Sequence, residues 1–336
     1  MKVRQAVIMV GGLGTRLRPL TENCPKPVLP VAGKPCIKYL IESMASAGAE
    51  DVILACGYRS EKMREALGDG RDLGIGLRYS YENRPMGTGG ALKLLEPELD
   101  KVFLASNGDV FTDIRISSLA GCHFSSGADV TVALTPVPNP WNFGVARQGE
   151  DGSILEFREG LSPDQVFSDL INAGLYVVDK KVMEMIPEGR QYDFSKELFP
   201  KIISSGGKLM GMRSEGMWMD VGRPGDYLRA NLHAAGNVYD VPEGCRITGN
   251  FRMGEGSSVR SSVIDSSVLM ENVSVTDSEL KRAVILGGSR ISGARIENSI
   301  IGRGCTVCPG SVVTCSVLGD GETVEPGTVR NDGREV

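Results

Sequence analysis

The chain has 336 residues, of which 41% are hydrophobic and 24% charged, and its formal net charge is -5. These values are ordinary for a folded protein with a buried core, so they exclude a largely disordered chain. The negative charge gives no support for nucleic acid or a membrane surface as the main partner, and the length suits two domains. No apolar run approaches the roughly 20 residues that cross a bilayer, and residues 1–4 lead into a strand without a signal peptide. We therefore expect a cytoplasmic protein.

Eight cysteines are spread through the chain, several of them in apolar stretches. This distribution favours free thiols in a reducing compartment over a disulfide framework. Cys305 and Cys308 form the one close pair in the sequence. Because a zinc site would need a second pair or histidines nearby, we predict no structural metal.

A β-branched, apolar run at residues 6–10 predicts a buried strand, and three glycines follow it closely. Gly11, Gly12 and Gly14 have no Cβ, so the backbone N–H groups of this loop can approach phosphate oxygens. The loop is not a Walker A motif, because no Lys-Ser or Lys-Thr follows its glycines, and it is not the Gly-x-Gly-x-x-Gly dinucleotide fingerprint. It predicts a phosphate site of another kind.

Strand and helix patterns alternate over the next hundred residues. Apolar side chains at i, i+3, i+4 and i+7 predict a helix over residues 37–44, and a second helix is expected at 61–67. Buried strands are expected at 52–55, 77–81 and 102–105. The alternation predicts an α/β, Rossmann-like domain with a mostly parallel sheet. Ligands in such folds lie beyond the carboxyl ends of the strands, where Gly11 and Asp109 occur.

The part from residue 129 to 179 is richer in strand patterns, with candidates at 130–134, 143–146 and 174–178. We expect it to supply the second wall of the cleft. Helices are expected at 196–203 and 226–235.

The composition changes beyond about Tyr239, where Gly, Ser and Val dominate and Phe251 is the last aromatic residue. Clusters of one small and two aliphatic residues recur at Val268, Val284, Ile300 and Val317, with spacings of 16, 16 and 17 residues. Six-residue steps lie within this repeat, and hexads grouped in threes are typical of a parallel β-helix with a triangular cross-section. We predict a left-handed parallel β-helix of hexapeptide repeats at 237–336, after a first domain at 1–236.

The motifs of the first domain resemble those of a known family. The pattern Gly-Gly-x-Gly-Thr-Arg-Leu-x-Pro-Leu-Thr begins at Gly11, and Pro25-Lys26-Pro27 and Gly33-Lys34-Pro35 follow it. Together they resemble the signature of the sugar-1-phosphate nucleotidylyltransferases, also called nucleotide-sugar pyrophosphorylases. The resemblance continues through residues 82–91, 107–109, 172–174 and 218–222, and it is greatest to the GDP-mannose pyrophosphorylases.

The resemblance implies the transfer of a nucleotidyl group from an NTP to a sugar 1-phosphate, most specifically from GTP to mannose 1-phosphate, with release of pyrophosphate. Glucose-1-phosphate thymidylyl- and uridylyltransferases share nearly all of these motifs. Two anions must meet in this reaction, so the site needs cations that neutralise charge and align the groups. The catalytic cations implied are Arg16 and Lys26, and the Mg²⁺ ligands implied are Asp109 and Asp220.

The remaining site residues implied by the resemblance bind the two substrates. The nucleotide would be held by Gly11, Gly12, Gly14, Thr15, Glu82, Gly87 and Thr88. The sugar would be held by Gly144, Glu159 and Asn172. The family usually follows its sugar-binding glutamate with Lys-Pro, whereas this chain has Gly160 there. Three explanations stay open: Arg158 or another cation substitutes, the affinity for sugar phosphate is lowered, or the chain is a non-catalytic relative.

Two other functions remain open from the sequence. The same two-domain architecture occurs in non-catalytic regulatory subunits, which Gly160 favours, whereas retention of Arg16, Lys26, Asp109 and Asp220 favours an enzyme. Acyl transfer by the β-helix is disfavoured, because His123 and His233 both lie outside the repeats. We expect the β-helix to make a homo-oligomer.

Overall fold

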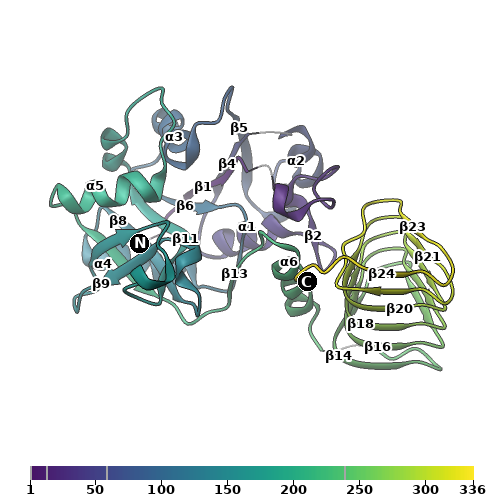
Figure 1. Ribbon diagram of the computed structural model, residues 1–336. Coiled ribbons are helices and arrows are strands. Elements are labelled where there is room, and N and C mark those ends of the chain that lie inside the picture. Colours follow the sequence, from purple (N-terminus) through teal and green to yellow (C-terminus); the bar gives the residue numbers. More distant parts are fainter. Residues whose placement is uncertain (1, 13, 58–59, 238–239) are drawn as a thin grey trace. The chain divides into compact units, whose positions relative to one another are not determined.

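The computed structural model describes residues 2–12, 14–57, 60–237 and 240–336 (Figure 1). Its contacts divide the chain into two compact units. The first unit comprises Met1–Gly12 and Ile37–Trp218, and the second comprises Leu13–Cys36 and Met219–Val336. Part of the glycine-rich motif is therefore grouped with the C-terminal repeats. The domain boundary predicted after residue 236 stays a prediction, and the change of composition near Tyr239 falls outside the described residues.

A nine-stranded sheet forms the centre of the first unit, with the order β10-β9-β11-β6-β1-β4-β5 and with β8 between β11 and β12. Strands β1, β4, β5 and β6 are parallel, whereas β11 is antiparallel to β6 and β8. The strands are β1 (Gln5–Val10), β4 (Asp51–Cys56), β5 (Gly76–Tyr81), β6 (Val102–Asn107), β8 (Val130–Pro136), β9 (Val145–Gln148), β10 (Ile154–Arg158), β11 (Leu170–Asp179) and β12 (Leu209–Arg213).

The expected strand at 143–146 begins two residues later than predicted, because a 3-10 turn occupies Pro140–Asn142. A short pair, β2 (Pro30–Val31) and β3 (Lys34–Pro35), and a second pair formed by β7 (Val110–Thr112) and β13 (Trp218–Asp220) complete the strands before the repeats.

The α-helices are α1 (Cys36–Ser46), α2 (Ser60–Leu67), α3 (Gly87–Leu94), α4 (Ile116–Ser126), α5 (Phe199–Ser204) and α6 (Pro224–Ala235). In α1 the four apolar residues at helical spacing, Ile37, Leu40, Ile41 and Met44, are all buried, as the pattern predicts. The helix expected at 196–203 is a π-turn, Phe194–Leu198, that continues into α5. Among the helices of the described residues, none is long and apolar enough to span a membrane.

The repeats of the second unit form two stacks of parallel strands, as expected for a hexapeptide β-helix (Figure 1). One stack contains β14 (Arg246–Met253), β16 (Val263–Leu269), β18 (Glu279–Ile285), β20 (Arg295–Ile301), β22 (Val312–Thr314) and β24 (Val329–Asn331). The other contains β15 (Ser258–Arg260), β17 (Ser274–Thr276), β19 (Arg290–Ser292), β21 (Thr306–Val307) and β23 (Thr323–Val324). Aliphatic residues such as Ile264, Leu280 and Ile296 align from coil to coil and are fully or almost fully buried.

Corners recur in every coil of the β-helix at residues with a positive φ. One column of corners consists of Ser266, Arg282, Asn298 and Cys315, which have φ between 45° and 49°. Ser261, Asp277, Gly293 and Gly310 share a second column, and Asn272 and the glycines at 256, 288, 304 and 321 share a third. Three corners in each coil explain the triangular cross-section. The left-handed conformation favours glycine and asparagine, which explains the glycines of the second column and the glycines and Asn272 of the third.

Candidate functional site

The predicted nucleotide residues of the first unit follow strands that end at one edge of the sheet. Gly11 follows β1, Glu82 follows β5 and Asp109 lies two residues after β6. The strands are parallel and in register, with Met9 opposite Asn107, so their carboxyl ends share this edge. Gly108 N donates to Met9 O at 2.9 Å, which brings the turn before Asp109 next to the end of β1.

The backbone at Gly11 and Gly12 faces open space. Both residues are exposed, and a Cβ placed on either would meet no atom of the described structure within 4 Å. On the opposite side, Gly57 packs closely on this backbone, since a Cβ on Gly57 would lie 3.1 Å from Gly11 Cα. The loop after β1 is therefore supported from one side and accessible to a ligand from the other.

Glu82, Gly87 and Thr88 belong to one turn at the start of α3. Glu82 Oε2 accepts a hydrogen bond of 3.1 Å from Met86 N, and Thr88 Oγ1 accepts one of 2.8 Å from Phe194 N. Gly87 has φ +72°, and a Cβ there would lie 2.6 Å from Tyr192 O. Partial burial raises the pKa of Glu82, although the hydrogen bond from Met86 lowers it. These contacts hold the turn together and fix it against residues 192–194.

The three predicted sugar residues lie together in the first unit. Asn172 N donates to Gly144 O at 2.9 Å, and a Cβ on Gly144 would lie 2.9 Å from Glu159 Oε1 and 2.4 Å from Phe157 Cζ. Only glycine fits at position 144, because any side chain would push both Phe157 and the carboxylate away. The cluster therefore gathers Glu159 and Asn172 around Gly144, and carboxylate and amide groups suit sugar hydroxyls.

Asn172 is itself held by its neighbours. Its Nδ2 donates to Tyr176 OH at 2.9 Å, and its Oδ1 accepts from Gly174 N at 2.9 Å. Burial and the nearby negative charge of Glu159 raise the pKa of Tyr176, so its hydroxyl stays protonated. The orientation of the amide is thus fixed before any ligand arrives.

A lysine that sequence reasoning missed lies next to Glu159. Lys196 Nζ is 3.6 Å from Glu159 Oε2, and Ser195 Oγ donates to Glu159 Oε1 at 2.6 Å. Arg158, the candidate substitute, pairs instead with Glu156 at 2.7 Å. Asp193 accepts hydrogen bonds from the backbone of residues 195 and 196, a helix-start pattern that is visible in the sequence. This helix-start pattern does not indicate that Lys196 lies beside Glu159, which follows β10.

Gly160 has a structural reason to be glycine. Its φ is +73°, in the left-handed region, where a lysine would be strained. The backbone after Glu159 therefore differs from a Glu-Lys-Pro segment, in which proline requires the lysine before it to be extended.

The remaining predicted residues of the glycine-rich motif belong to the second unit. They lie in residues 14–27, here called the signature loop. Gly14 has φ +63°, and a Cβ there would lie 2.9 Å from Lys26 Cβ. Thr21 Oγ1 donates to Gly14 O at 2.8 Å. Thr15 and Arg16 lie on the exposed side of a 3-10 turn, Thr15–Leu17, whose Leu17 is buried. Gly14 thus allows the two ends of the signature loop to touch.

Lys26, Arg16 and Asp220 meet around Gly222 within the second unit. Lys26 Nζ lies 3.4 Å from Asp220 Oδ1, and the Lys26 side chain is only 10% exposed. A Cβ on Gly222 would lie 3.1 Å from Asp220 Oδ1 and 3.4 Å from Arg16 Nη2. The arrangement places Lys26 beside the Asp220 carboxylate, and a Cβ at position 222 would crowd both this carboxylate and Arg16.

Carboxylate oxygens are hard ligands of the kind that Mg²⁺ prefers, so the chemistry of Asp109 and Asp220 fits this ion. Among the described residues, no group of three or more His, Cys, Asp and Glu is arranged to hold a metal. An ion held by two carboxylates would complete its shell with phosphate and water oxygens, as Mg²⁺ commonly does. Asp109 belongs to the first unit and Asp220 to the second, so their pairing stays a prediction.

Comparison with known proteins identifies both parts of the chain. A family model described as nucleotidyl transferase matches residues 5–236, and one described as GlmU-like, C-terminal hexapeptide matches residues 242–324. Mannose-1-phosphate guanylyltransferase of Mycobacterium tuberculosis is 36% identical over 239 residues, which are 70% of this chain and 66% of that protein. UTP--glucose-1-phosphate uridylyltransferase of Synechocystis sp. is 29% identical over 332 residues, or 92% of this chain and 81% of that protein.

Among solved structures, HddC from Yersinia pseudotuberculosis has a TM-score of 0.60 and 25% identity, over 69% of this chain and 100% of that one. The chain spans slightly less than two thirds of the length of the Mycobacterium relative. The nucleotidyl transferase model nevertheless matches well over half of the chain, and it includes every predicted site residue. The chain therefore belongs to the nucleotidyl transferase family.

Proposed function

We propose that this protein transfers a nucleotidyl group from an NTP to a sugar 1-phosphate, with GTP and mannose 1-phosphate as its substrates. The observation that carries the proposal is the cluster of Arg16, Lys26 and Asp220 around Gly222. A largely buried lysine beside a carboxylate, next to an exposed arginine on a tight turn, suits a phosphate chain that must be bound and then released.

In the proposed reaction, a phosphate oxygen of the sugar 1-phosphate attacks the α-phosphorus of the NTP. The bond from the α-phosphorus to the bridging oxygen breaks, and pyrophosphate leaves with the electron pair. Lys26 would neutralise the phosphate charge as a point charge, and Arg16 would bind the leaving pyrophosphate through its planar fork of N–H donors. Asp109 and Asp220 would hold Mg²⁺, which when bound offsets the negative charge of the phosphates.

The nucleotide would lie along the edge formed by Gly11, Gly12 and the Glu82 turn, with Gly14 and Thr15 next to the phosphates. Gly144, Glu159 and Asn172 would bind the sugar hydroxyls. Lys196 would take the place of the lysine that is missing at Gly160, because its ammonium already lies 3.6 Å from Glu159 Oε2. The sugar pocket would then keep a cation although the local sequence lacks one.

The choice of GTP and mannose 1-phosphate is supported by the names of relatives, which include guanylyltransferases of Mycobacterium tuberculosis and Schizosaccharomyces pombe. The Synechocystis relative, a uridylyltransferase, keeps a uridylyl or thymidylyl transfer to glucose 1-phosphate as the alternative. A few pocket contacts decide between bases, so a substrate panel is the direct test.

A second candidate is a regulatory subunit without turnover, which the absence of lysine at position 160 favours. The β-helix would in either case serve as the surface of a homo-oligomer, which light scattering of the full chain tests. A monomer at working concentration would refute this part of the proposal.

The deciding experiment is a pyrophosphate-release assay with all common NTPs against mannose and glucose 1-phosphates, in the presence of Mg²⁺. We expect the highest kcat/KM with GTP and mannose 1-phosphate. Turnover with another pair only would correct the substrate, and no turnover with any pair at high enzyme concentration would leave the regulatory subunit as the better reading.

A further inference from the structure

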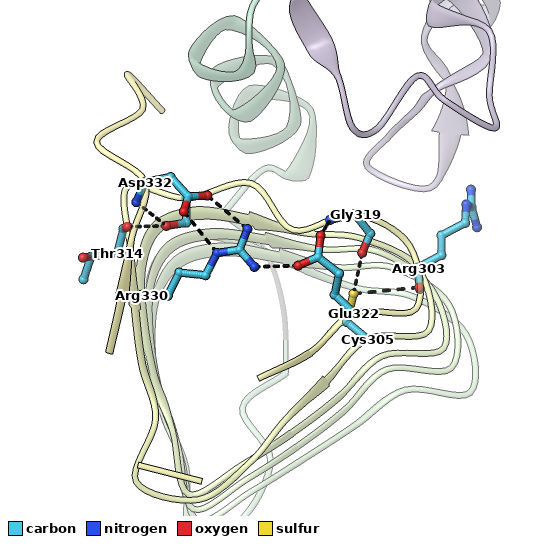
Figure 2. Close-up of polar contacts among 8 residues, drawn as sticks. Arg303, Cys305, Thr314, Gly319, Glu322, Arg330 and Asp332 are labelled. Atoms are coloured by element: carbon cyan, nitrogen blue, oxygen red, sulfur yellow. Dashed lines mark hydrogen bonds and ion pairs between the residues drawn. The ribbon is translucent and has the colours of Figure 1, made fainter. Parts of the chain in front are cut away.

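The last coil of the β-helix carries a charge where the earlier coils carry aliphatic residues. Arg330 of β24 aligns with Val313 of β22, which is completely buried and itself aligns with Ile296. Figure 2 shows the Arg330 side chain reaching across the end of the coil, with Glu322 on one side and Asp332 on the other. The end of the stack is thus built around an ion cluster.

Arg330 joins two carboxylates that belong to different parts of the last coil. Its Nη1 donates to Glu322 Oε2 at 2.5 Å, and its Nε donates to Asp332 Oδ1 at 3.1 Å. Glu322 Oε1 in turn accepts from Gly319 N at 2.6 Å, and Cys305 Sγ donates to Gly319 O at 3.0 Å. Both backbone groups of Gly319 are therefore fixed (Figure 2).

Gly319 is the first of two points where the last coil contacts the signature loop. A Cβ placed on Gly319 would lie 3.3 Å from Pro19 Cβ, so the backbone of the coil packs directly on this proline. Pro19 lies three residues after Arg16, on the chain that leaves the 3-10 turn. The contact supports the turn from the side of the β-helix.

The C-terminal residues make the second contact. Asp332 N donates to Ser316 Oγ at 3.0 Å, and Arg334 N donates to Cys315 O at 2.9 Å, which together fix the start of the tail. Arg334 Nη1 then donates to Arg18 O at 2.8 Å. Arg18 also closes the turn that carries Arg16, because Arg18 N donates to Thr15 O at 3.2 Å. Arg334 therefore binds the residue that ends this turn.

The same tail also lies against the helix that follows Asp220. A Cβ on Gly225, the second residue of α6, would lie 3.2 Å from Glu335 O. The last residues of the chain thus touch both segments that meet at Gly222, the signature loop and the start of α6. These contacts all lie within the second unit.

We propose that the last coil and the C-terminal tail hold the signature loop in its phosphate-binding conformation, with Arg334 as a positioning residue for Arg16. The inference rests on the proposed function, in which Arg16 binds pyrophosphate. Without these contacts, the exposed turn that carries Arg16 would have to become ordered when the ligand binds, and the lost conformational entropy would weaken binding. Contacts that order the turn beforehand remove this entropic cost.

The test compares the full-length Arg334→Ala, Arg334→Lys and Arg290→Ala variants with the wild-type protein. Arg290 is an exposed arginine on β19 and serves as the charge-matched control. Hydrogen exchange of the backbone amides in residues 14–21 reports the order of the loop, and isothermal titration with pyrophosphate and Mg²⁺ reports ligand affinity. We expect Arg334→Ala to speed exchange in this segment and to weaken pyrophosphate binding about 2- to 30-fold. Arg334→Lys should restore much of both, because lysine can also donate to the Arg18 carbonyl.

Unchanged exchange in residues 14–21 of Arg334→Ala would overturn the proposal. Faster exchange with unchanged pyrophosphate affinity would show that the tail orders the loop without positioning Arg16, and would also overturn it. An equal effect of Arg290→Ala would show that the loss of one positive charge, and not the contact of Arg334, causes the change, and would also overturn the proposal. Failure of the wild-type protein to turn over any substrate pair contradicts the proposed function instead, and it is measured separately from the exchange of the loop.

Discussion

Lys26 Nζ lies 3.4 Å from Asp220 Oδ1, although 194 positions separate the two residues in the chain. Each side chain is held by its own element, Lys26 by a 3-10 turn between two prolines and Asp220 by the end of β13. Lys26 depends on Asp220 electrostatically, because a largely buried ammonium is destabilised unless a negative charge compensates it. A bound phosphate chain can take over part of this role.

Removing the charge of Lys26 is expected to abolish most of the turnover. In Lys26→Met the apolar stem is kept, and only the ammonium is lost. We expect kcat/KM to fall by about 100- to 1,000-fold, as is usual for the loss of one electrostatic contact to a transition state. The pyrophosphate-release assay measures the change, and Lys281→Met, on the surface of β18, is the control. A fall of less than about threefold would contradict the assignment.

A methyl group at Gly222 is expected to disturb the cluster without unfolding the protein. The Cβ of Gly222→Ala would lie 3.1 and 3.3 Å from the two carboxylate oxygens of Asp220 and 3.4 Å from Arg16 Nη2. Because these atoms must then shift by a few tenths of an ångström, turnover should fall by about tenfold or more. Steady-state kinetics and the apparent affinity for Mg²⁺ measure the effect.

The matched control is Gly121→Ala in α4. Gly121 is exposed in the middle of the helix, and a Cβ there would meet no described atom within 4 Å. Alanine should raise the free energy of unfolding by about 0.5–1 kcal/mol and leave the kinetics unchanged. If both alanine variants lost activity equally, the clash at Gly222 would not be the cause.

Lys196→Met is expected to act on the sugar substrate alone. Loss of a charge-assisted hydrogen bond to the sugar phosphate should raise its KM by about 10- to 100-fold, while the KM for the NTP stays unchanged. Arg158→Met, whose guanidinium pairs with Glu156, should change neither value. Equal increases in both KM values for Lys196→Met would exclude Lys196 as the cation of the sugar pocket.

Asp51 is expected to link stability to pH. The hydrogen bonds from Arg78 to both of its oxygens lower the pKa of this carboxyl, so its folded value lies below its unfolded value of 3.8. Its contribution is therefore complete above about pH 5 and is lost as the pH falls through the folded value. Asp51→Asn should destabilise the protein at pH 7, and the difference from the wild type should shrink toward about pH 3. Urea unfolding at several pH values measures this, and a difference independent of pH would contradict it.

The local features of this protein were decided by its sequence. The strand at β1 follows from an apolar run that can only be buried, and the coils of the β-helix follow from small and aliphatic residues that recur every 16 or 17 positions. The sequence also supplied glycines at positions 14 and 144, where the structure shows that a Cβ would lie 2.9 Å from Lys26 Cβ and 2.4 Å from Phe157 Cζ, respectively. Such features depend on residues that are adjacent in the chain or that recur at a fixed spacing, and both can be read directly from the sequence.

Tertiary structure alone decided which distant residues meet. Lys196 approaches Glu159 because the turn before α5 packs beside the end of β10, and no spacing between positions 159 and 196 predicts this. The grouping of the signature loop with the repeats is of the same kind, since Arg334 reaches the carbonyl of Arg18 across 316 positions. Contacts between residues so far apart in the chain depend on how whole helices and strands pack. The sequence therefore determined which chemical groups are present, and the tertiary packing determined which of them are in contact.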